Sequence, residues 1–138
     1  MKKIELTKIV TFNKLIDTLK LEKLSGQEKY DLLKLFRKIK LISNEFEGFK
    51  QDIIQKYIST DECKENMEKS NNGDEEAKKY IEKINSEINN IIYLELNSIK
   101  EIDIDPVSEQ TFMNFVDSNP DLKISDTLLI EEILLGSE

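Results

Sequence analysis

The side chains that could do chemistry in this sequence are few, because histidine is absent and cysteine occurs once, at Cys63. Without histidine, the Ser-His-Asp and Cys-His relays of nucleophilic catalysis are excluded. Zinc sites built from Cys and His are excluded too, since one thiolate cannot form a cluster. A lone thiol also forms no disulfide within the chain, which favours a reducing compartment. We therefore interpret Cys63 as a bystander.

Carboxylates are the other candidates, and they recur as Asp61-Glu62, Glu65, Asp74-Glu75-Glu76, Asp103 and Asp105. A Mg²⁺ or Ca²⁺ site needs oxygens in a set geometry, and the sequence contains no D-x-D-x-D-G loop. The four glycines, at positions 26, 48, 73 and 136, lie too far apart for a phosphate-binding loop. Solvated carboxylates are the simpler interpretation. We expect no metal site, no cofactor and no enzymatic activity.

The charge balance argues against direct nucleic-acid binding. The 138 residues include 20 Lys plus Arg against 28 Asp plus Glu, giving a net charge of −8. Arg37 is the only arginine, whereas guanine readout and bidentate phosphate contacts favour arginine. The charged share of 35% exceeds the usual quarter, which indicates thin, well-solvated elements.

No apolar run approaches the 18 or more residues that cross a bilayer, and charges interrupt the first apolar stretch. We expect a soluble protein that is intracellular, or packaged into something made inside a cell, with no membrane partner.

The N-terminal segment Lys3–Ile9 predicts a short strand, because Ile4 and Leu6 alternate with polar residues. Thr11 is then expected to cap a short helix. Ser25 and Glu28 form an S-x-x-E capping box, which predicts the start of a longer helix.

This longer helix is predicted from Gln27 to about Ser59. Its apolar residues alternate in steps of three and four, which is typical of a helix seam. The seam consists of Leu32, Leu35, Ile39, Ile42, Phe46, Phe49 and Ile53. A helix with such a stripe needs a partner, from its own chain or from another.

A polar segment from 59 to 73 is expected to link this helix to a second one, from Asp74 to about Asn97. The second seam consists of Ala77, Ile81, Ile84, Ile88 and Ile91. The two helices predict a long antiparallel hairpin. Residues 92–96 also alternate as in a strand, but we favour helix there.

Residues Lys100–Asp105 predict a second strand, expected to pair with the N-terminal strand as a ribbon whose acidic residues face lysines. Ser108 is expected to cap a helix that stops at Asn119-Pro120. Ser125 is expected to cap a last helix, from Asp126 to Leu135, with Gly136 at its C-terminal end.

Two interpretations of the seam remain open: the core of an intramolecular hairpin, or a surface that also pairs between subunits. The apolar last helix is likewise either a core element or a docking element. The candidate interaction residues are Leu32, Leu35, Ile39, Ile42, Phe46, Phe49, Ile53, Leu129, Ile133 and Leu134.

The run IELTKIVTFNKLIDTLKLEKLSGQEKYDLLKLFRKIKLISNEFEGFK resembles a set of small uncharacterised proteins encoded by tailed bacteriophages of gut bacteria. Its shared features are the I-E-L strand, a brief helix, and a Leu/Lys/Arg-rich helix closing on the E-F-x-x-F element at 45–49. The resemblance implies a phage origin and a role in the particle or its assembly. It implies no catalytic residues.

We therefore expect one mainly helical (α+β) domain over residues 1–138, with a long helical hairpin, a two-stranded ribbon and short C-terminal helices. The leading hypothesis is a non-enzymatic protein–protein interaction module of a bacteriophage virion or its assembly. Its partners would be phage structural proteins or further copies of itself, in the host cytoplasm during assembly or in the virion. The alternative is a small acidic inhibitor of a host or defence nucleic-acid enzyme.

Overall fold

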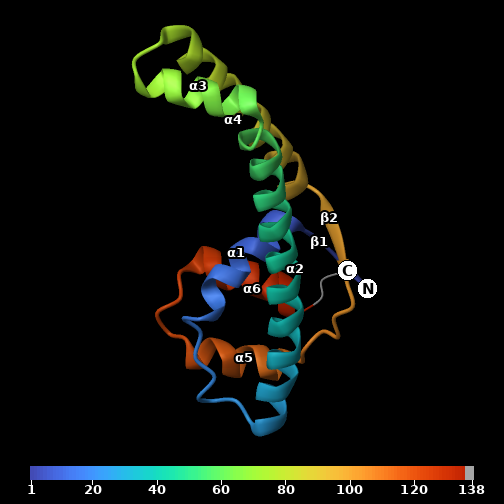
Figure 1. Cartoon of the computed structure of the whole chain (residues 1–138). Helices are drawn as coiled ribbons and strands as arrows, with labels where there is room; N and C mark the ends of the chain where they lie inside the picture. The colour runs from blue at the N-terminus through green and yellow to red at the C-terminus, as the bar shows by residue number, and fades with distance from the viewer. Residues whose placement is uncertain (136–138) are drawn as a thin grey trace. The chain divides into compact units, whose positions relative to one another are not determined.

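A computed structural model describes residues 1–135. The described chain is mainly helical, with one two-stranded antiparallel ribbon, which confirms the predicted α+β class (Figure 1). In chain order the elements are β1 (Lys2–Glu5), α1 (Leu6–Ile16), α2 (Gly26–Ile58), α3 (Asp61–Asn71), α4 (Glu75–Leu96), β2 (Ile99–Ile102), α5 (Glu109–Ser118) and α6 (Ile124–Leu134).

The chain divides into two compact units. Unit 1 comprises Met1–Ser43 and Ser98–Glu138, of which the structure describes residues up to 135, and unit 2 comprises Asn44–Asn97. Helix α2 is continuous through the boundary at residue 43. Two compact units joined by one unbroken helix are compatible with one domain or with two. The single domain expected over residues 1–138 therefore stays a prediction.

The ribbon of unit 1 pairs the two segments that the sequence predicted. Ile4 lies opposite Lys100, and Lys3 lies opposite Glu101, with 3.9 Å between the Lys3 Nζ and a Glu101 carboxylate oxygen. The predicted extent to Asp105 was wrong. The Ile104 amide donates to the Ile102 carbonyl, so a tight turn ends β2 at Ile102.

Helix α1 begins earlier than predicted. It starts at Leu6, directly after β1, and buries Leu6, Ile9, Phe12 and Ile16. The expected cap at Thr11 was wrong, because Thr11 lies inside the helix and its hydroxyl donates to the Thr7 carbonyl. The apolar residues at positions 6, 9, 12 and 16 follow the spacing of a helix. The prediction missed the first of them because residues 3–9 also alternate as in a strand.

The predicted capping box at the start of α2 is confirmed. The Glu28 amide donates to Ser25 Oγ at 3.2 Å, and the Ser25 amide donates to Glu28 Oε1 at 2.9 Å. From there α2 runs to Ile58, one residue short of the predicted end. Its first half contributes the buried residues Leu32, Leu35, Phe36 and Ile39 to the core of unit 1.

The last two helices complete that core. Ser108 caps α5 as predicted, accepting from the Thr111 amide at 3.1 Å. Helix α6 begins at Ile124, so Ser125 is not its cap as expected, and no side chain caps it. At its other end the Lys2 ammonium donates to the carbonyls of Glu132 and Ile133, where the helix dipole favours a cation. Gly136 lies outside the described residues.

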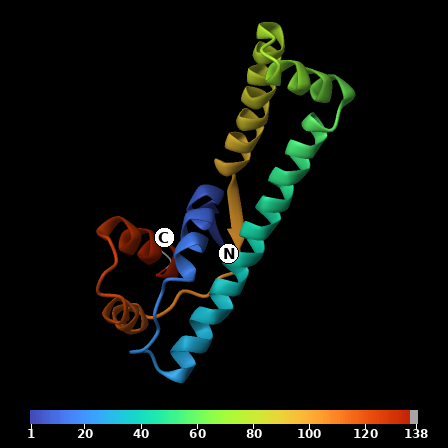
Figure 2. The same ribbon diagram turned by 60° about the vertical axis from the view of Figure 1, so that its left-hand side comes forward.

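Unit 2 consists of the second half of α2 with α3 and α4. Beyond residue 43, α2 runs in the direction opposite to α4, as the hairpin prediction requires (Figure 2). The polar segment 59–73 is not a plain linker, because its residues Asp61–Asn71 form α3. Helix α4 reaches Leu96, so residues 92–96 are helical, as favoured.

Among the helices of unit 2, the most extensive backbone contact is between α3 and α4. A tight turn joins them, in which Gly73 has a φ of 90° and Asp74 Oδ1 accepts from the Ala77 amide at 2.9 Å. The small side chains Cys63 and Ala77 are buried in this unit. The sequence predicted the turn but not the helix before it, because α3 has almost no apolar stripe.

Candidate functional site

The residues predicted to contact a partner mostly form the core. Two groups separate by burial. The buried ones are Leu32, Leu35, Ile39, Phe46, Ile133 and Leu134. The half-buried ones are Ile42, Phe49, Ile53 and Leu129. A partner reaches the first group only after the core opens, so these six positions fit the intramolecular alternative that the seam left open.

The side chains that the sequence singled out for chemistry differ in their burial. Cys63 is buried on α3, whereas Asp103 and Asp105 are exposed. Within residues 1–135, no group of three or more Cys, Asp or Glu side chains is placed to hold a metal ion. Burial raises the pKa of the Tyr80 phenol on α4, and the nearby Glu62 carboxylate on α3 adds to the increase.

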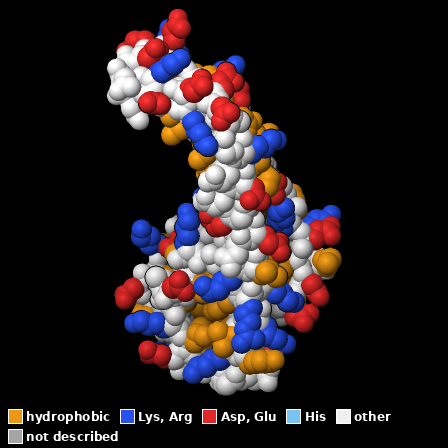
Figure 3. Space-filling model, viewed as in Figure 1, with side chains coloured by type: hydrophobic (Ala, Val, Ile, Leu, Met, Phe, Trp, Pro, Cys, Tyr) orange, Lys and Arg blue, Asp and Glu red, His pale blue; other side chains and the backbone are white. Residues whose placement is uncertain are grey.

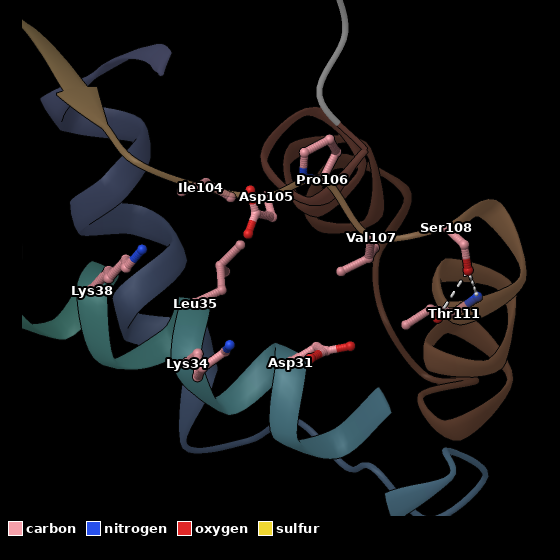
Figure 4. Close-up of a pocket in the computed structure, with 10 residues that line it drawn as sticks. All are labelled: Asp31, Lys34, Leu35, Lys38, Ile104, Asp105, Pro106, Val107, Ser108 and Thr111. Carbon is pink, nitrogen blue, oxygen red and sulfur yellow. Dashed lines mark hydrogen bonds between the residues drawn. The ribbon is translucent and has the colours of Figure 1, made fainter. Parts of the chain in front are cut away.

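A hollow in unit 1 lies between the first half of α2 and the chain that leads into α5. Its volume is about 390 Å³, at the lower end of the range for small-molecule pockets. Figure 4 shows Lys34 and Lys38 extending from α2, and Asp105 turned from the loop toward Leu35. Ser108 closes the far end through its hydrogen bond to Thr111.

This hollow has a mixed lining. Asp31 and Asp105 bring carboxylates, Lys34 and Lys38 bring ammonium groups, and Leu35, Ile104, Pro106 and Val107 form its apolar wall. The Lys38 ammonium already donates to the Asp103 carbonyl. Because charges of both signs share the lining, neither a simple anion nor a simple cation is favoured.

Three apolar side chains point to solvent from the outer face of α2, opposite its buried seam. Tyr30 is 53% exposed, Leu33 42% and Leu41 60%. We call these three residues the α2 stripe. Their positions fall within about 80° of one another around a helix of 3.6 residues per turn, so they share one face.

Cations border the α2 stripe. The Lys34 Nζ lies 5.1 Å from the centre of the Tyr30 ring, within the range of a cation–π contact. Among the described residues, no carboxylate forms an ion pair with Lys34, Arg37 or Lys38. Figure 3 shows orange and blue side chains next to one another over this half of α2.

A second exposed stripe lies on α6. Ile124 is 81% exposed and Leu128 is 59% exposed, and they are four residues apart on one helix face. We call these two residues the α6 stripe. The opposite face of α6 buries Ile130, Ile133 and Leu134. Two of the candidate interaction residues on α6, Ile133 and Leu134, are therefore core residues, and the third, Leu129, is half-buried.

The sequence interpretation missed both stripes because it followed the strongest periodic signal. In α2 the apolar periodicity of the seam, which includes Leu32 and Leu35, is stronger than that of the outer residues, because lysines separate the outer residues. The α2 stripe could have been predicted from the apolar residues at positions 30, 33 and 41, which share the helix face opposite the seam.

No protein-family model, no curated protein and no solved structure matches this chain. In the part of the chain that the structure describes, no helix combines the length and hydropathy needed to cross a membrane.

Proposed function

We propose that this protein is a non-enzymatic protein–protein interaction module. The observation that carries the proposal is the pair of apolar helix stripes that unit 1 leaves in solvent, on α2 and on α6. Single exposed apolar residues are ordinary on protein surfaces, whereas apolar residues aligned on one face of a helix offer a continuous surface to a partner.

The magnitude of the exposed surface supports this function. Complete burial of a leucine or isoleucine side chain contributes about 1.5–3 kcal/mol. Ile124 and Leu128 together would therefore contribute several times the thermal energy to a complex. Interfaces draw most of their binding energy from a few such central residues, with a polar rim around them.

The setting we propose is a bacteriophage particle or its assembly in the host cytoplasm. The N-terminal resemblance to proteins of tailed phages supports this setting. The partners would be phage structural proteins or a second copy of the chain. A capsid, tail or assembly gene beside the coding sequence would favour the proposal, whereas an unrelated neighbourhood would oppose it.

A direct test compares the wild-type chain with an Ile124→Glu/Leu128→Glu variant. Affinity capture from the cells that naturally produce the chain, read by quantitative mass spectrometry, should lose its specific partners in the variant. Light scattering would detect self-association by the same contrast. The matched control is Ser125→Glu/Gln110→Glu, which adds two charges at exposed polar positions. Equal capture by all three proteins would contradict the role of α6.

A second candidate function has its own observation. Unit 2 carries 13 acidic against seven basic side chains, and Asp61, Glu65 and Glu68 follow one face of α3. This excess is the reason to retain the acidic inhibitor of a nucleic-acid enzyme. Red and blue side chains are interspersed on the visible face of unit 2, which weighs against it (Figure 3).

The inhibitor predicts salt-sensitive competition with DNA for one host enzyme. Replacing Asp61, Glu65 and Glu68 by Asn and Gln should then abolish competition and leave capture through α6 unchanged. Competition that survives these replacements would contradict the inhibitor.

A further inference from the structure

We infer that the outer face of the first half of α2 is a docking site for an acidic amphipathic helix of another protein. This inference rests on the proposed interaction function and names the chemistry of one partner. It needs both the exposed apolar residues of the α2 stripe and the cations that border them.

The charge of this segment departs from that of the whole chain. Between Lys29 and Leu41, α2 has five cations and one anion, while the chain has a net charge of −8. Lys40 is neutralised by Asp17 at 3.3 Å, but Lys34, Arg37 and Lys38 form no ion pair among the described residues. Complementary carboxylates would speed the encounter and fix the register.

The apolar part has the dimensions of a helix contact. From Tyr30 to Leu41 the stripe covers about 16 Å at 1.5 Å per residue, or three helical turns. A partner helix with apolar residues three and four positions apart can match this length. The Lys34 ammonium is held over the Tyr30 ring, so less side-chain entropy is lost when it meets a carboxylate.

The neighbouring hollow restricts where the partner's carboxylates can lie. Asp31 and Asp105 line the hollow on the flank of α2 away from Lys40, where they offset the charges of Lys34 and Lys38 and make the hollow a weaker site for an acidic side chain than the stripe itself. Arg37 is exposed and, at 3.6 residues per turn, its position on α2 falls in the middle of the stripe, whereas the position of Asp31 lies about 120° away around the helix. The preferred register therefore places acidic side chains over Arg37 and Lys34 and apolar ones over Leu33 and Leu41.

A short acidic helix fits this face better than a nucleic acid does. The basic segment is only three turns long, and the rest of unit 1 contains more acidic than basic side chains. An extended polyanion would have to cross that acidic surface. Only one arginine is available for bidentate phosphate contacts.

The test measures fluorescence anisotropy with three labelled probes on the intact chain. The first is an 18-residue helical peptide with leucines at positions i, i+3, i+4 and i+7 and glutamates between them. The second has the same leucines with lysines, and the third is a single-stranded RNA of 18 nucleotides. We expect the acidic peptide to bind at least tenfold more tightly than either other probe, and more weakly as salt is raised.

Leu33→Glu and Arg37→Glu should each weaken binding of the acidic peptide at least tenfold, with circular dichroism and thermal unfolding checking that the fold is kept. Leu94→Glu, at a 71% exposed leucine on α4, is the matched control and should leave binding unchanged. Arg37→Lys should retain most of the affinity, because it keeps the charge.

Equal binding of the acidic and lysine peptides would overturn the inference, as would tighter binding of RNA. Self-association abolished by Leu33→Glu would replace the acidic partner by a second copy of the chain, which also overturns it. If the α2 variants bind normally while Ile124→Glu/Leu128→Glu loses its captured partners, this inference fails and the proposed function stands. If neither pair of variants alters capture, the proposed function fails as well.

Discussion

At the scale of single residues, the Asn119 side chain, at the end of α5, makes three hydrogen bonds to the backbone. Its Nδ2 donates to the carbonyls of Lys20, at 2.7 Å, and Phe115, at 2.9 Å. Its Oδ1 accepts from the Lys20 amide at 2.7 Å. Beside it, Ser118 Oγ accepts from the Lys23 amide at 2.9 Å. Two adjacent side chains thus satisfy the irregular backbone between α1 and α2.

The first prediction concerns this anchor. Asn119→Ala should lower the free energy of unfolding by about 2–3 kcal/mol, because buried backbone groups lose their partners. Asn119→Asp should be at least as damaging, since a carboxylate cannot donate to the two carbonyls. Urea unfolding measures both, and Asp117→Asn, at the exposed neighbouring position, serves as the control. A loss of less than 0.5 kcal/mol for Asn119→Ala, about the usual size for a surface change, would contradict the anchor.

The second prediction concerns Glu28 and pH. The Ser25 amide that donates to its carboxylate lowers the pKa of Glu28, and hydrogen bonds from Thr111, Ser25 and Asn114 lower it further. A lowered pKa in the folded state means that Glu28 stabilises the fold above pH 4.5, its ordinary value. The stabilisation should be lost as the pH falls through the lower folded pKa.

Stability measured by urea unfolding between pH 2 and 6 should therefore decrease less toward acid in Glu28→Gln than in the wild type. Ser25→Ala is the comparison, because it keeps the backbone amide that contributes most to the pKa shift. It should cost about 1 kcal/mol throughout and retain most of the pH dependence. Parallel curves for Glu28→Gln and the wild type would refute the assignment.

At the scale of elements, local signals predicted the starts of helices where side chain and backbone bond reciprocally. The Ser25–Glu28 box and the Ser108 cap are such cases, because three or four consecutive residues contain the whole interaction. The ribbon was predicted from two alternating segments with complementary charge. The end of the second strand was not predicted correctly. The turn at Ile104 depends on backbone geometry, and no residue type within Lys100–Asp105 is a turn signal.

The errors arose where apolar periodicity was absent, ambiguous or dominated by the core. Helix α3 lacks an apolar stripe, so periodicity could not reveal it, and its stability comes from packing on α4 within unit 2. The sequence prediction made helix α1 too short, because its first residues also alternate between apolar and polar as in a strand. The candidate interaction residues were chosen for their strong apolar period, and this same property makes them core residues. The α2 stripe and the α6 stripe carry too few residues to outweigh that period.

A pair of glycines supplies the third prediction. Gly48 lies inside α2 with open space where a Cβ would be, so Gly48→Ala should raise the free energy of unfolding by about 0.5–1 kcal/mol. Gly73 has a φ of 90° between α3 and α4, so Gly73→Ala should lower it by about 1 kcal/mol. Thermal unfolding of the two variants measures the opposite shifts. Stabilisation by Gly73→Ala would contradict the left-handed turn.

At the scale of the whole molecule, the core is unevenly distributed between the units. Among the largest fully buried side chains, Phe12, Phe115, Leu6, Ile9, Leu32, Ile39, Ile130, Ile133 and Leu134 lie in unit 1, and only Cys63 lies in unit 2. Regions with fewer buried apolar residues open at lower free energy. We therefore expect unit 2 to open without global unfolding.

The fourth prediction uses Cys63 as the reporter of this opening. Its thiol is buried, so a thiol reagent should label it only after unit 2 opens. Labelling in water should be faster than the global unfolding rate extrapolated from urea kinetics, and it should depend weakly on urea because little surface is exposed. Hydrogen exchange should likewise be faster in α3 and α4 than in α1. Labelling at the global unfolding rate would show that the two units open together.

The central claim is that the exposed stripes of unit 1 bind other proteins. Photo-crosslinking in the cells that naturally produce the chain tests it most directly, with benzoylphenylalanine replacing Leu33, Leu128 or, as the control, the exposed Asn72. The account predicts discrete adducts with defined proteins from positions 33 and 128 and none of these from position 72. Identical adduct patterns from all three positions, or no adduct from either stripe, would contradict it.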